Sequence, residues 1–361
     1  MVCAPAPRLA NCAKAATTLP VPHSDMIIRF ESEQAANYPV AGIPAAVRAV
    51  LALPNRQRWR RIAISVPGGW RPSMHCLEEW HRLCSGVAMN PCDDQYPTGS
   101  AAPHIMEGIV TLEDAVLPKG TRHLPAMSRL HALHAQIIKD TAKPTDGIVS
   151  RHLNRPVSQG ITRVLLHVFP QIIPLYATVA VAIFALVMIA ALLLGGTTGA
   201  IIGAVLFQAA SVLDGVDGEI ARATFRTSQT GATMDSVTDA FTNLGFIMGL
   251  SWNLCQQGET LPASAGAAGL VLLAIGLLIL GKIAYRRDGR VHFDALKARF
   301  STSPNPIGAV LAKIFMRDFY ALALALAVIA GFAGLALFLF AGAVAGWLAI
   351  VVWTVLFSRM A

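Results

Sequence analysis

The sequence predicts an α-helical membrane protein in which a bundle of six transmembrane helices follows a small cytosolic α/β domain and an interfacial amphipathic helix. Hydrophobic residues make up 54% of the chain and charged residues only 14%, whereas a soluble domain usually carries about 25% charged residues. From Val164 onward, long apolar runs are separated by short polar breaks, and the basic residues gather in alternate breaks. This is the pattern of a chain that crosses a membrane repeatedly.

The composition divides the chain into four parts. The first 25 residues are rich in Ala and Pro, lack the apolar core of a signal peptide, and are expected to be disordered. Residues 26–145 are predicted to form the cytosolic α/β domain and residues 146–172 the juxtamembrane amphipathic helix. Residues 173–361 are predicted to form the six-span domain.

A helix followed by a strand is expected within the cytosolic domain. The segment Tyr38–Pro44 leads into an apolar-periodic helix that ends near Leu53, and residues 61–66 form a hydrophobic run typical of a buried strand. Residues 26–30 are a further candidate strand. This order of elements favours an α/β layer.

Six apolar segments are candidate membrane spans, and each comes close to the ~20 residues needed to cross the hydrocarbon, except the fifth, which is short. The expected ranges are 175–194, 199–213 continuing into an Asp-rich stretch, 231–254, 265–283, 319–333 and 335–357.

The distribution of basic residues predicts which side of the membrane each loop occupies. Lys and Arg lie before span one (Arg151, Arg155, Arg163), between spans two and three (Arg222, Arg226), between spans four and five (Lys282, Arg286, Arg287, Arg290, Lys297, Arg299, Lys313, Arg317) and at the end of the chain (Arg359). The opposite loops contain none. Both termini are therefore expected on the cytoplasmic side of the inner (cytoplasmic) membrane. The net charge of +8 is assigned to this asymmetry, and no nucleic-acid partner is expected.

The segment between Ser150 and Phe169 places apolar residues at near-helical spacing, with three arginines among them. This pattern predicts an amphipathic helix lying in the cytoplasmic interface. The alternative is a simple basic flank of span one.

Four aspartates are predicted to converge at the cytoplasmic ends of spans two and three. Asp214 and Asp217 are three residues apart and share a helix face, and Gly231, Asp235 and Asp239 are spaced four apart on the next helix. The short connection makes the two helices antiparallel. The four carboxylates therefore meet at membrane depth.

Such a cluster needs cations. One charged residue at mid-bilayer costs about 2.5–3.5 kcal/mol on insertion scales, and Arg222 and Arg226 are too few to neutralise the acids. Mg²⁺ or Mn²⁺, in two sites, would satisfy carboxylate oxygens and leave positions for substrate phosphates. Gly215, Gly218 and Gly231 remove side chains where a nucleotide or a neighbouring helix must come close.

The spacing D-x-x-D-G-x-x-A-R-x8-G-x3-D-x3-D, from Asp214 to Asp239, resembles the signature of the CDP-alcohol phosphotransferase (phosphatidyltransferase) family. The resemblance implies a membrane enzyme that moves a phospho-alcohol group from a CDP-alcohol donor to an alcohol acceptor and releases CMP, in phospholipid or inositol-phosphodiester synthesis. It implies that Asp214, Asp217 and Asp235 hold metal, and that Asp239 helps hold a second ion and acts as the general base. Membrane lipid is an expected partner, and a homodimer is one option for the assembly.

The same resemblance implies a nucleotide site. Gly218, Ala221, Arg222 and Gly231 would line it. Relatives carry a P-N-x-x-T element at the start of span one. The segment Pro174–Thr178 keeps its Pro and Thr but has Leu in place of Asn, so Thr178 is a candidate contact to the nucleotide.

Arg317, Lys282 and Arg286 are candidates for holding a phosphate of the acceptor, and the alternative is that they only fix topology. The donor is left open between CDP-diacylglycerol and a CDP-polyol such as CDP-inositol. A different class of function is a membrane transporter that uses the acidic cluster as an ion site, which would require polar residues at mid-depth in several spans.

Residues 143–151 look like the junction in bifunctional enzymes of the inositol-phosphate cytidylyltransferase and di-inositol-phosphate-phosphate synthase type. Residues 26–145 would then be nucleotidyltransferase-like. A Gly-rich phosphate loop is not found before Tyr38, and Glu31 and Glu33 stand where a triphosphate would bind. This domain is therefore expected to be degenerate and without cytidylyltransferase activity.

Overall fold

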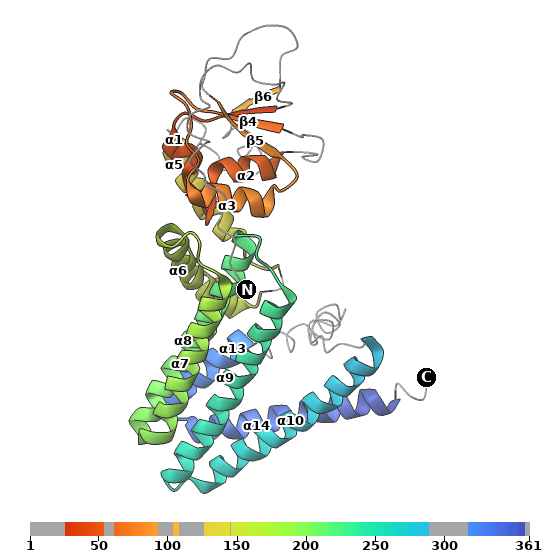
Figure 1. Ribbon diagram of the computed structural model, residues 1–361. Coiled ribbons are helices and arrows are strands. Elements are labelled where there is room, and N and C mark those ends of the chain that lie inside the picture. Colours follow the sequence, from red (N-terminus) through yellow and green to blue (C-terminus); the bar gives the residue numbers. More distant parts are fainter. Residues whose placement is uncertain are drawn as a thin grey trace, which may run out of the picture. The chain divides into compact units, whose positions relative to one another are not determined.

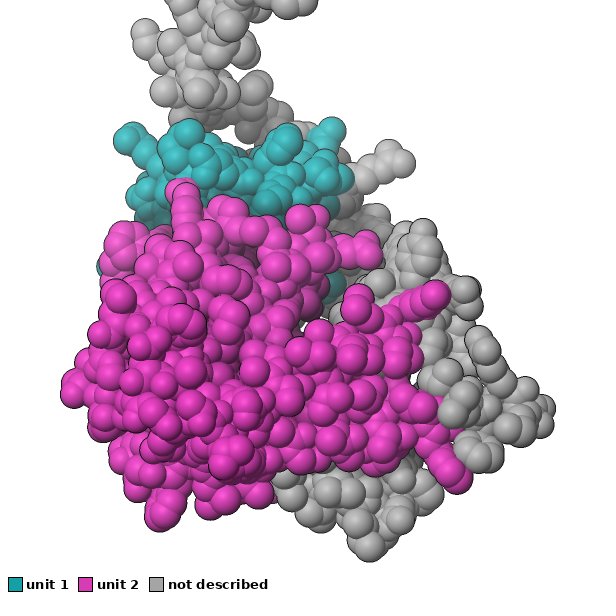
Figure 2. All heavy atoms as spheres, turned by 90° about the horizontal axis from the view of Figure 1, so that it is seen from below, with its two compact units in different colours: residues 1–134 teal, residues 135–361 magenta. Residues whose placement is uncertain are grey.

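The protein was studied as a computed structural model, which describes residues 26–53, 61–92, 104–107, 126–144, 146–288 and 317–357. The chain separates into two compact units, Met1–His134 and Ala135–Ala361, which Figure 2 shows in different colours. The disorder predicted for the first 25 residues lies outside the described residues, as does most of the basic stretch between spans four and five.

The first unit contains a parallel sheet with the strand order β5-β4-β1-β6 (Figure 1). Its strands are β1 (Met26–Arg29), β4 (Arg61–Ser65), β5 (Ala88–Cys92) and β6 (His104–Glu107). Parallel strands are usually covered on both faces, and Ile62, Ala63 and Ile64 of β4 are accordingly fully buried. Strands thus occupy the two ranges for which the sequence predicted them, residues 26–30 and 61–66.

Helices accompany this sheet in the order expected of an α/β layer. They are α1 (Glu33–Asn37), α2 (Ala45–Ala52), α3 (Met74–Leu83) and α5 (Ala126–Lys139), and a short hairpin of β2 (Pro39–Val40) and β3 (Ile43–Pro44) precedes α2. The hairpin turn has positive φ at Ala41 and Gly42. The buried Arg48 side chain donates to the carbonyl oxygens of Val40 and Ala41, so a residue of the predicted helix fixes the turn before it. Burial lowers the pKa of Arg48 to about 9.

The second unit is helical. After the π-helical turn η4 (Ser150–Asn154) and α6 (Arg155–Val168) come α7 (Pro174–Leu194), α8 (Gly196–Ala223), α9 (Gln229–Gln256), α10 (Thr260–Asp288), α13 (Arg317–Ile329) and α14 (Ala333–Phe357). By length and composition, four stretches of the described residues are candidate membrane spans: 174–194, 196–223, 260–279 and 333–353. Helix α9 is as long but more polar, and the apolar part of α13, residues 318–329, is shorter.

The core of the second unit is shared by α7, α8, α9, α10, α13 and α14. Phe207 of α8 and Phe246 of α9 stack with ring centroids 4.1 Å apart and are both almost fully buried. At the end of the bundle where α7 turns into α8, the Asn253 amide of α9 donates to the carbonyl oxygens of Leu192 (2.6 Å) and Gly196 (2.9 Å). These contacts fix α8 against α9, which matters because both helices carry the acidic residues.

The close packing of α10 against α14 depends on a glycine. A Cβ added at Gly276 would lie 2.1 Å from the Trp347 ring, whereas one added at Gly342 would meet nothing within 4 Å. We expect Gly276→Ala to lower the free energy of unfolding by about 1–3 kcal/mol, because overpacking forces the helices apart. Unfolding of the detergent-solubilised protein, followed by tryptophan fluorescence, measures this, with Gly342→Ala as the control. Equal stabilities of the two variants would contradict the packing described.

Candidate active site

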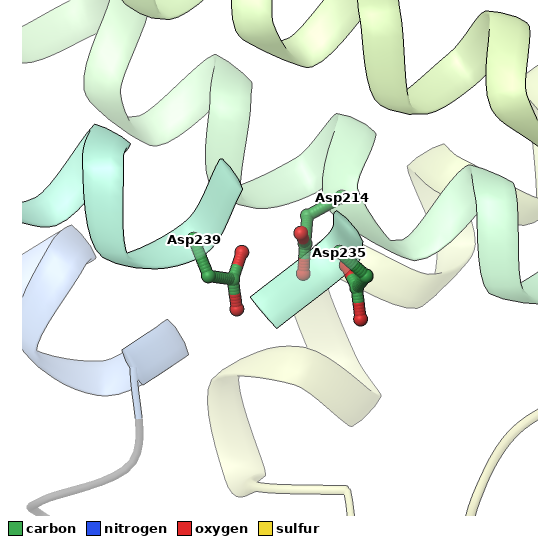
Figure 3. Close-up of side chains that lie close together, drawn as sticks. All are labelled: Asp214, Asp235 and Asp239. Carbon is green, nitrogen blue, oxygen red and sulfur yellow. The ribbon is translucent and has the colours of Figure 1, made fainter. Parts of the chain in front are cut away.

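Three carboxylates from two helices point towards one another at the junction of α8 and α9 (Figure 3). Asp214 lies near the end of α8, and Asp235 and Asp239 lie one turn apart near the start of α9. One oxygen atom from each of the three lies within 4.8 Å of the others. The connection between the helices is short, and α9 begins at the N-cap Ser228, whose Oγ accepts a hydrogen bond from the Gly231 N–H. The structure therefore brings together three of the four predicted aspartates.

The donor set fits a hard divalent cation. All three groups are half-buried carboxylates, the ligand type that Mg²⁺ and Mn²⁺ prefer. Two oxygens bound to the same Mg²⁺ lie at most about 4.2 Å apart, because each is about 2.1 Å from the ion. At most one pair among three such oxygens can lie that far apart, and adjacent pairs lie about 3.0 Å apart. An ion shared by all three carboxylates would therefore draw their oxygens closer together than the 4.8 Å within which they lie, and partial exposure leaves room for substrate oxygens.

Asp217 is not a member of this group of three. Its side chain is buried, and its Oδ2 accepts a hydrogen bond of 2.7 Å from the Thr178 Oγ1 at the start of α7. Its Oδ1 accepts from the backbone N–H of Gly218. Thr178, which the sequence suggested as a nucleotide contact, therefore joins α7 to the acidic segment of α8. The role of Asp217 as a metal ligand stays a prediction.

The candidate nucleotide residues lie on both sides of the α8–α9 turn. A Cβ added at Gly218 would lie 2.9 Å from a guanidinium nitrogen of Arg222, so a glycine lets the arginine lie back along its own helix. Arg222 Nε donates to the carbonyl oxygen of Thr141 (2.8 Å). Ala221 is half-buried and Gly231 is exposed. The predicted close approach of a nucleotide to these glycines stays a prediction.

The candidate acceptor residues lie on two helices, α10 and α13. Lys282 is exposed near the end of α10. Arg286 lies on the same helix and Arg317 begins α13, but their side chains lie outside the described residues. Asp318, the neighbour of Arg317, accepts a 2.6 Å hydrogen bond from the backbone N–H of Ser150. The start of α13 is thereby joined to the segment that precedes α6.

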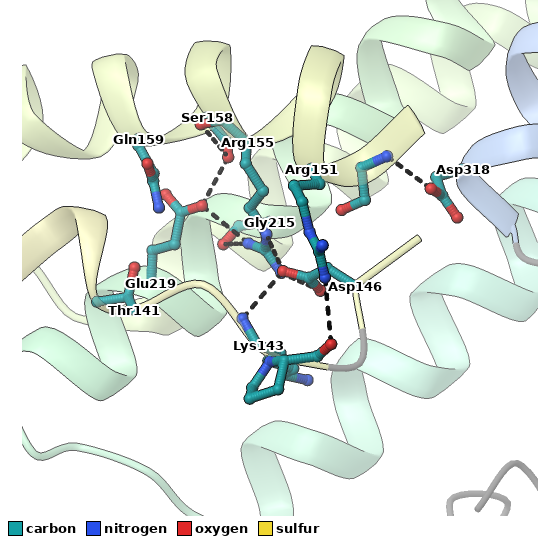
Figure 4. Close-up of polar contacts among 12 residues, drawn as sticks. Thr141, Lys143, Asp146, Arg151, Arg155, Ser158, Gln159, Gly215, Glu219 and Asp318 are labelled. Atoms are coloured by element: carbon teal, nitrogen blue, oxygen red, sulfur yellow. Dashed lines mark hydrogen bonds and ion pairs between the residues drawn. The ribbon is translucent and has the colours of Figure 1, made fainter. Parts of the chain in front are cut away.

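A buried ionic cluster, which the sequence reasoning did not find, lies on the other side of α8 (Figure 4). Glu219 is completely buried. It accepts hydrogen bonds from Arg155 Nη1 (2.8 Å), Ser158 Oγ (2.6 Å) and Thr162 Oγ1 (2.7 Å), all on α6. The remaining guanidinium nitrogens of Arg155 donate to Asp146, Nε to Oδ2 at 2.8 Å and Nη2 to Oδ1 at 3.1 Å.

The charges in this cluster are mutually stabilised. Burial favours the neutral form of Asp146, but the hydrogen bonds and positive charge of Arg155, with the backbone N–H of Lys143, lower its pKa overall. Burial disfavours the charged form of Arg155, yet its bonds to Asp146 and Glu219 raise its pKa. A sequence signal was present: Asn154, Ser158 and Thr162 recur every four residues and form a polar stripe that runs from the end of η4 along α6.

The family model described as CDP-alcohol phosphatidyltransferase matches residues 168–357. Curated proteins from several organisms are similar to part of this chain, and each of them is named "Bifunctional IPC transferase and DIPP synthase". The protein of Aquifex aeolicus is 38% identical over 117 residues, which cover 32% of this chain and 26% of the relative. The protein of Thermococcus kodakarensis is 36% identical over 118 residues, which cover 32% of this chain and 26% of the relative. The protein of Archaeoglobus fulgidus is 35% identical over 103 residues, which cover 28% of this chain and 19% of the relative. The matched part of the chain thus spans about a fifth to a quarter of the length of these relatives.

The contact between Thr178 and Asp217 predicts a difference between two substitutions. Thr178→Val keeps the shape of the side chain but removes the donor, which leaves a buried carboxylate oxygen unsatisfied. We expect it to lower the free energy of unfolding by about 1–3 kcal/mol. Thr178→Ser keeps the hydroxyl and is expected to cost less. Denaturant titration of the purified protein compares the two, and a Thr178→Val variant as stable as wild type would contradict the contact.

Proposed function

Because this chain belongs to the CDP-alcohol phosphatidyltransferase family, we propose that it is an integral membrane transferase that moves a phospho-alcohol group from a CDP-alcohol donor to an acceptor hydroxyl and releases CMP. The observation that carries the proposal is the convergence of Asp214, Asp235 and Asp239 within 4.8 Å, inside the part of the chain that the family model matches. The region also contains the apolar helices expected of a membrane enzyme.

In the proposed reaction, the acceptor oxygen attacks the phosphorus nearest the donor alcohol. A new bond forms between that oxygen and the phosphorus, the bond to the bridging oxygen of CMP breaks, and CMP leaves. Asp239 takes the proton of the acceptor hydroxyl. Asp214, Asp217, Asp235 and Asp239 would hold two Mg²⁺ or Mn²⁺ ions. When held by these carboxylates, such ions would neutralise negative charge on the phosphates and stabilise the leaving oxygen.

The remaining site residues are assigned by their position around the acidic group. Gly218, Ala221, Arg222, Gly231 and Thr178 are proposed to form the nucleotide site, supported by their location on α7, α8 and α9 next to the carboxylates. For the acceptor phosphate we propose Arg317, Lys282 and Arg286. The hydrogen bond between Asp318 and Ser150 supports this for Arg317, because it brings the start of α13 towards the α6 segment that contacts α8.

The substrates are proposed from the relatives and the junction segment. The curated relatives are named DIPP synthases, the type of enzyme that residues 143–151 also resemble. We therefore favour a CDP-polyol donor such as CDP-inositol, with CDP-diacylglycerol as the alternative. The first unit is proposed to lack cytidylyltransferase activity, because Glu31 and Glu33 lie within four residues of the end of β1, where a triphosphate would bind. CTP-dependent turnover of a polyol phosphate would contradict that assignment.

We propose that α9 and α13 complete a six-span bundle with both termini cytoplasmic. Support comes from the fact that both helices share the buried core of the apolar ones. The segment of η4 and α6 is proposed to lie in the interface, because its apolar residues Leu153, Val157, Val164 and Val168 are exposed while its polar stripe is buried. Exposed apolar residues on such a helix are suited to the acyl boundary.

The proposed role of Asp239 predicts a large loss of activity on substitution. Asp239→Asn keeps the shape of the side chain but removes both the base and a metal ligand, so the rate of CMP release is expected to fall by roughly 10²–10⁴-fold. Labelled CDP-inositol and CDP-diacylglycerol, each with a panel of alcohol acceptors and Mg²⁺, provide the assay. Asp140→Asn is the control, because Asp140 is exposed and, within the described part of the chain, its carboxylate accepts a hydrogen bond only from the nearby Gln136.

Two results would overturn the proposed function. One is a wild-type protein that releases no CMP from either donor. The other is Asp239→Asn turning over as fast as wild type. Cation flux through proteoliposomes, together with the first of these results, would instead favour the transporter alternative.

The proposed topology is tested by labelling cysteines. Cys255 is exposed near the end of α9, which the topology places on the side opposite the active site. In a variant that keeps only Cys255, a membrane-impermeant maleimide added to intact cells is expected to label the protein. A cysteine-free variant carrying Thr227→Cys, in the exposed α8–α9 turn, is expected to label only after the cells are lysed. The reverse pattern would show the opposite orientation.

A further inference from the structure

The buried carboxylate of Glu219 faces away from the proposed metal site. An α-helix turns about 100° per residue, so Glu219 lies about 140° around α8 from Asp214 and about 200° from Asp217. Its three side-chain donors, Arg155, Ser158 and Thr162, all come from α6. The short stretch of α8 that carries the proposed metal ligands is therefore bonded to α6 on the face opposite those ligands.

Arg155 is the centre of this contact. Its side chain is 11% exposed, that of Asp146 10% and that of Glu219 0%. Taking such charges out of water costs several kcal/mol per ion, and the cost is offset only when the geometry is good and the remaining hydrogen bonds are made. The planar guanidinium meets this demand because it bonds Asp146 through two nitrogens and Glu219 through the third. An ammonium group could not hold both carboxylates in this geometry.

Gly215 shows how closely this contact approaches the acidic segment. It stands directly after Asp214, and a Cβ added there would lie 2.9 Å from Arg155 Nη1 and 3.1 Å from Ser158 Oγ. The absence of a side chain at residue 215 therefore allows α6 to pack against the backbone of the turn that carries Asp214 and Asp217. The same turn is joined to α7 on another side through Thr178 and Asp217.

We infer that Arg155 and Glu219 are positioning residues of the metal site, and that the contact between them, with Asp146, Ser158 and Thr162, sets the rotation and depth of the α8 segment so that its carboxylates meet those of α9. The inference rests on the proposed function. Mg²⁺ demands near-ideal octahedral geometry, so a small rotation of this segment would separate Asp214 from Asp235 and Asp239. Outer residues that orient metal ligands typically contribute 10–100-fold to metal affinity.

The test measures metal binding directly. Full-length protein in lipid nanodiscs is titrated with Mn²⁺, and free Mn²⁺ is followed by electron paramagnetic resonance. Arg155→Lys keeps the charge but loses the planar fork, and Glu219→Gln keeps the shape but loses the charge. Both are expected to weaken Mn²⁺ binding by about 10–100-fold. Arg151→Lys is the matched control, because Arg151 is exposed one turn before Arg155 and, among the described residues, its side chain donates only a 3.4 Å hydrogen bond to the Pro144 carbonyl.

The dependence of CMP release on Mn²⁺ distinguishes positioning from general stability. For a positioning role, the half-saturating Mn²⁺ concentration rises in the variants while the rate at saturating Mn²⁺ is largely restored. Loss of folded protein alone would lower the rate at every Mn²⁺ concentration without moving the half-saturation point, and this result would overturn the inference. Unchanged Mn²⁺ affinity in folded Arg155→Lys and Glu219→Gln would overturn it as well.

Milder variants keep the inference testable if the charge variants fail to fold. Thr162→Val removes a single donor to Glu219, and Gly215→Ala pushes α6 away without altering a charge. Each is expected to weaken Mn²⁺ binding several-fold, and wild-type affinity in both would overturn the inference. Failure of the proposed function would be recognised separately, as a wild-type protein that binds Mn²⁺ but releases no CMP from any donor.

Discussion

Repulsion among like charges is the constraint on which the second unit depends. Asp214, Asp235 and Asp239 bring carboxylate oxygens within 4.8 Å of one another, and such an arrangement is unfavourable unless a cation neutralises it and the backbone prevents its relaxation. The helices that carry the aspartates are held by large contacts at a distance from the acids: the stacked Phe207 and Phe246, and the Asn253 amide at the far end of α9. The bundle holds the carboxylates where electrostatics alone would separate them.

Helix α8 carries three acidic residues that face three different neighbours. Asp214 lies close to the carboxylates of Asp235 and Asp239 on α9. Asp217 accepts a hydrogen bond from Thr178 of α7, and Glu219 is paired with Arg155 of α6. The observed partners differ: Asp217 has a hydroxyl group and Glu219 a guanidinium, and the proposed metal ions would neutralise Asp214 together with Asp217. A buried polar network of this kind is costly when only partly satisfied. The conformation of α8 is therefore determined by three contacts that all need to form together.

Much of the fold follows from local patterns in the sequence. The parallel strands β1 and β4, the helix α2 and the helices of the second unit lie where hydrophobic periodicity places them, because burial of an apolar face is a property of each segment. The polar stripe on α6 was harder to interpret. The apolar residues of this helix suggested only that it lies on a lipid surface. The sequence of a single helix does not show which other helix packs against its polar residues. The pairing of Glu219 with Arg155 joins residues 64 positions apart.

The sequence by itself determined that this chain has a hydrophobic helical half and a spaced set of aspartates on two consecutive helices, because composition, helical periodicity and motif spacing are local. Only the tertiary structure decided which of those aspartates meet. It brought Asp214, Asp235 and Asp239 within 4.8 Å of one another, joined Asp217 to Thr178, and packed the face of α8 that carries Glu219 against α6. The reason is that spacing defines the face of a helix, whereas the rotation of that helix against its neighbours is set by packing contacts between residues far apart in the chain.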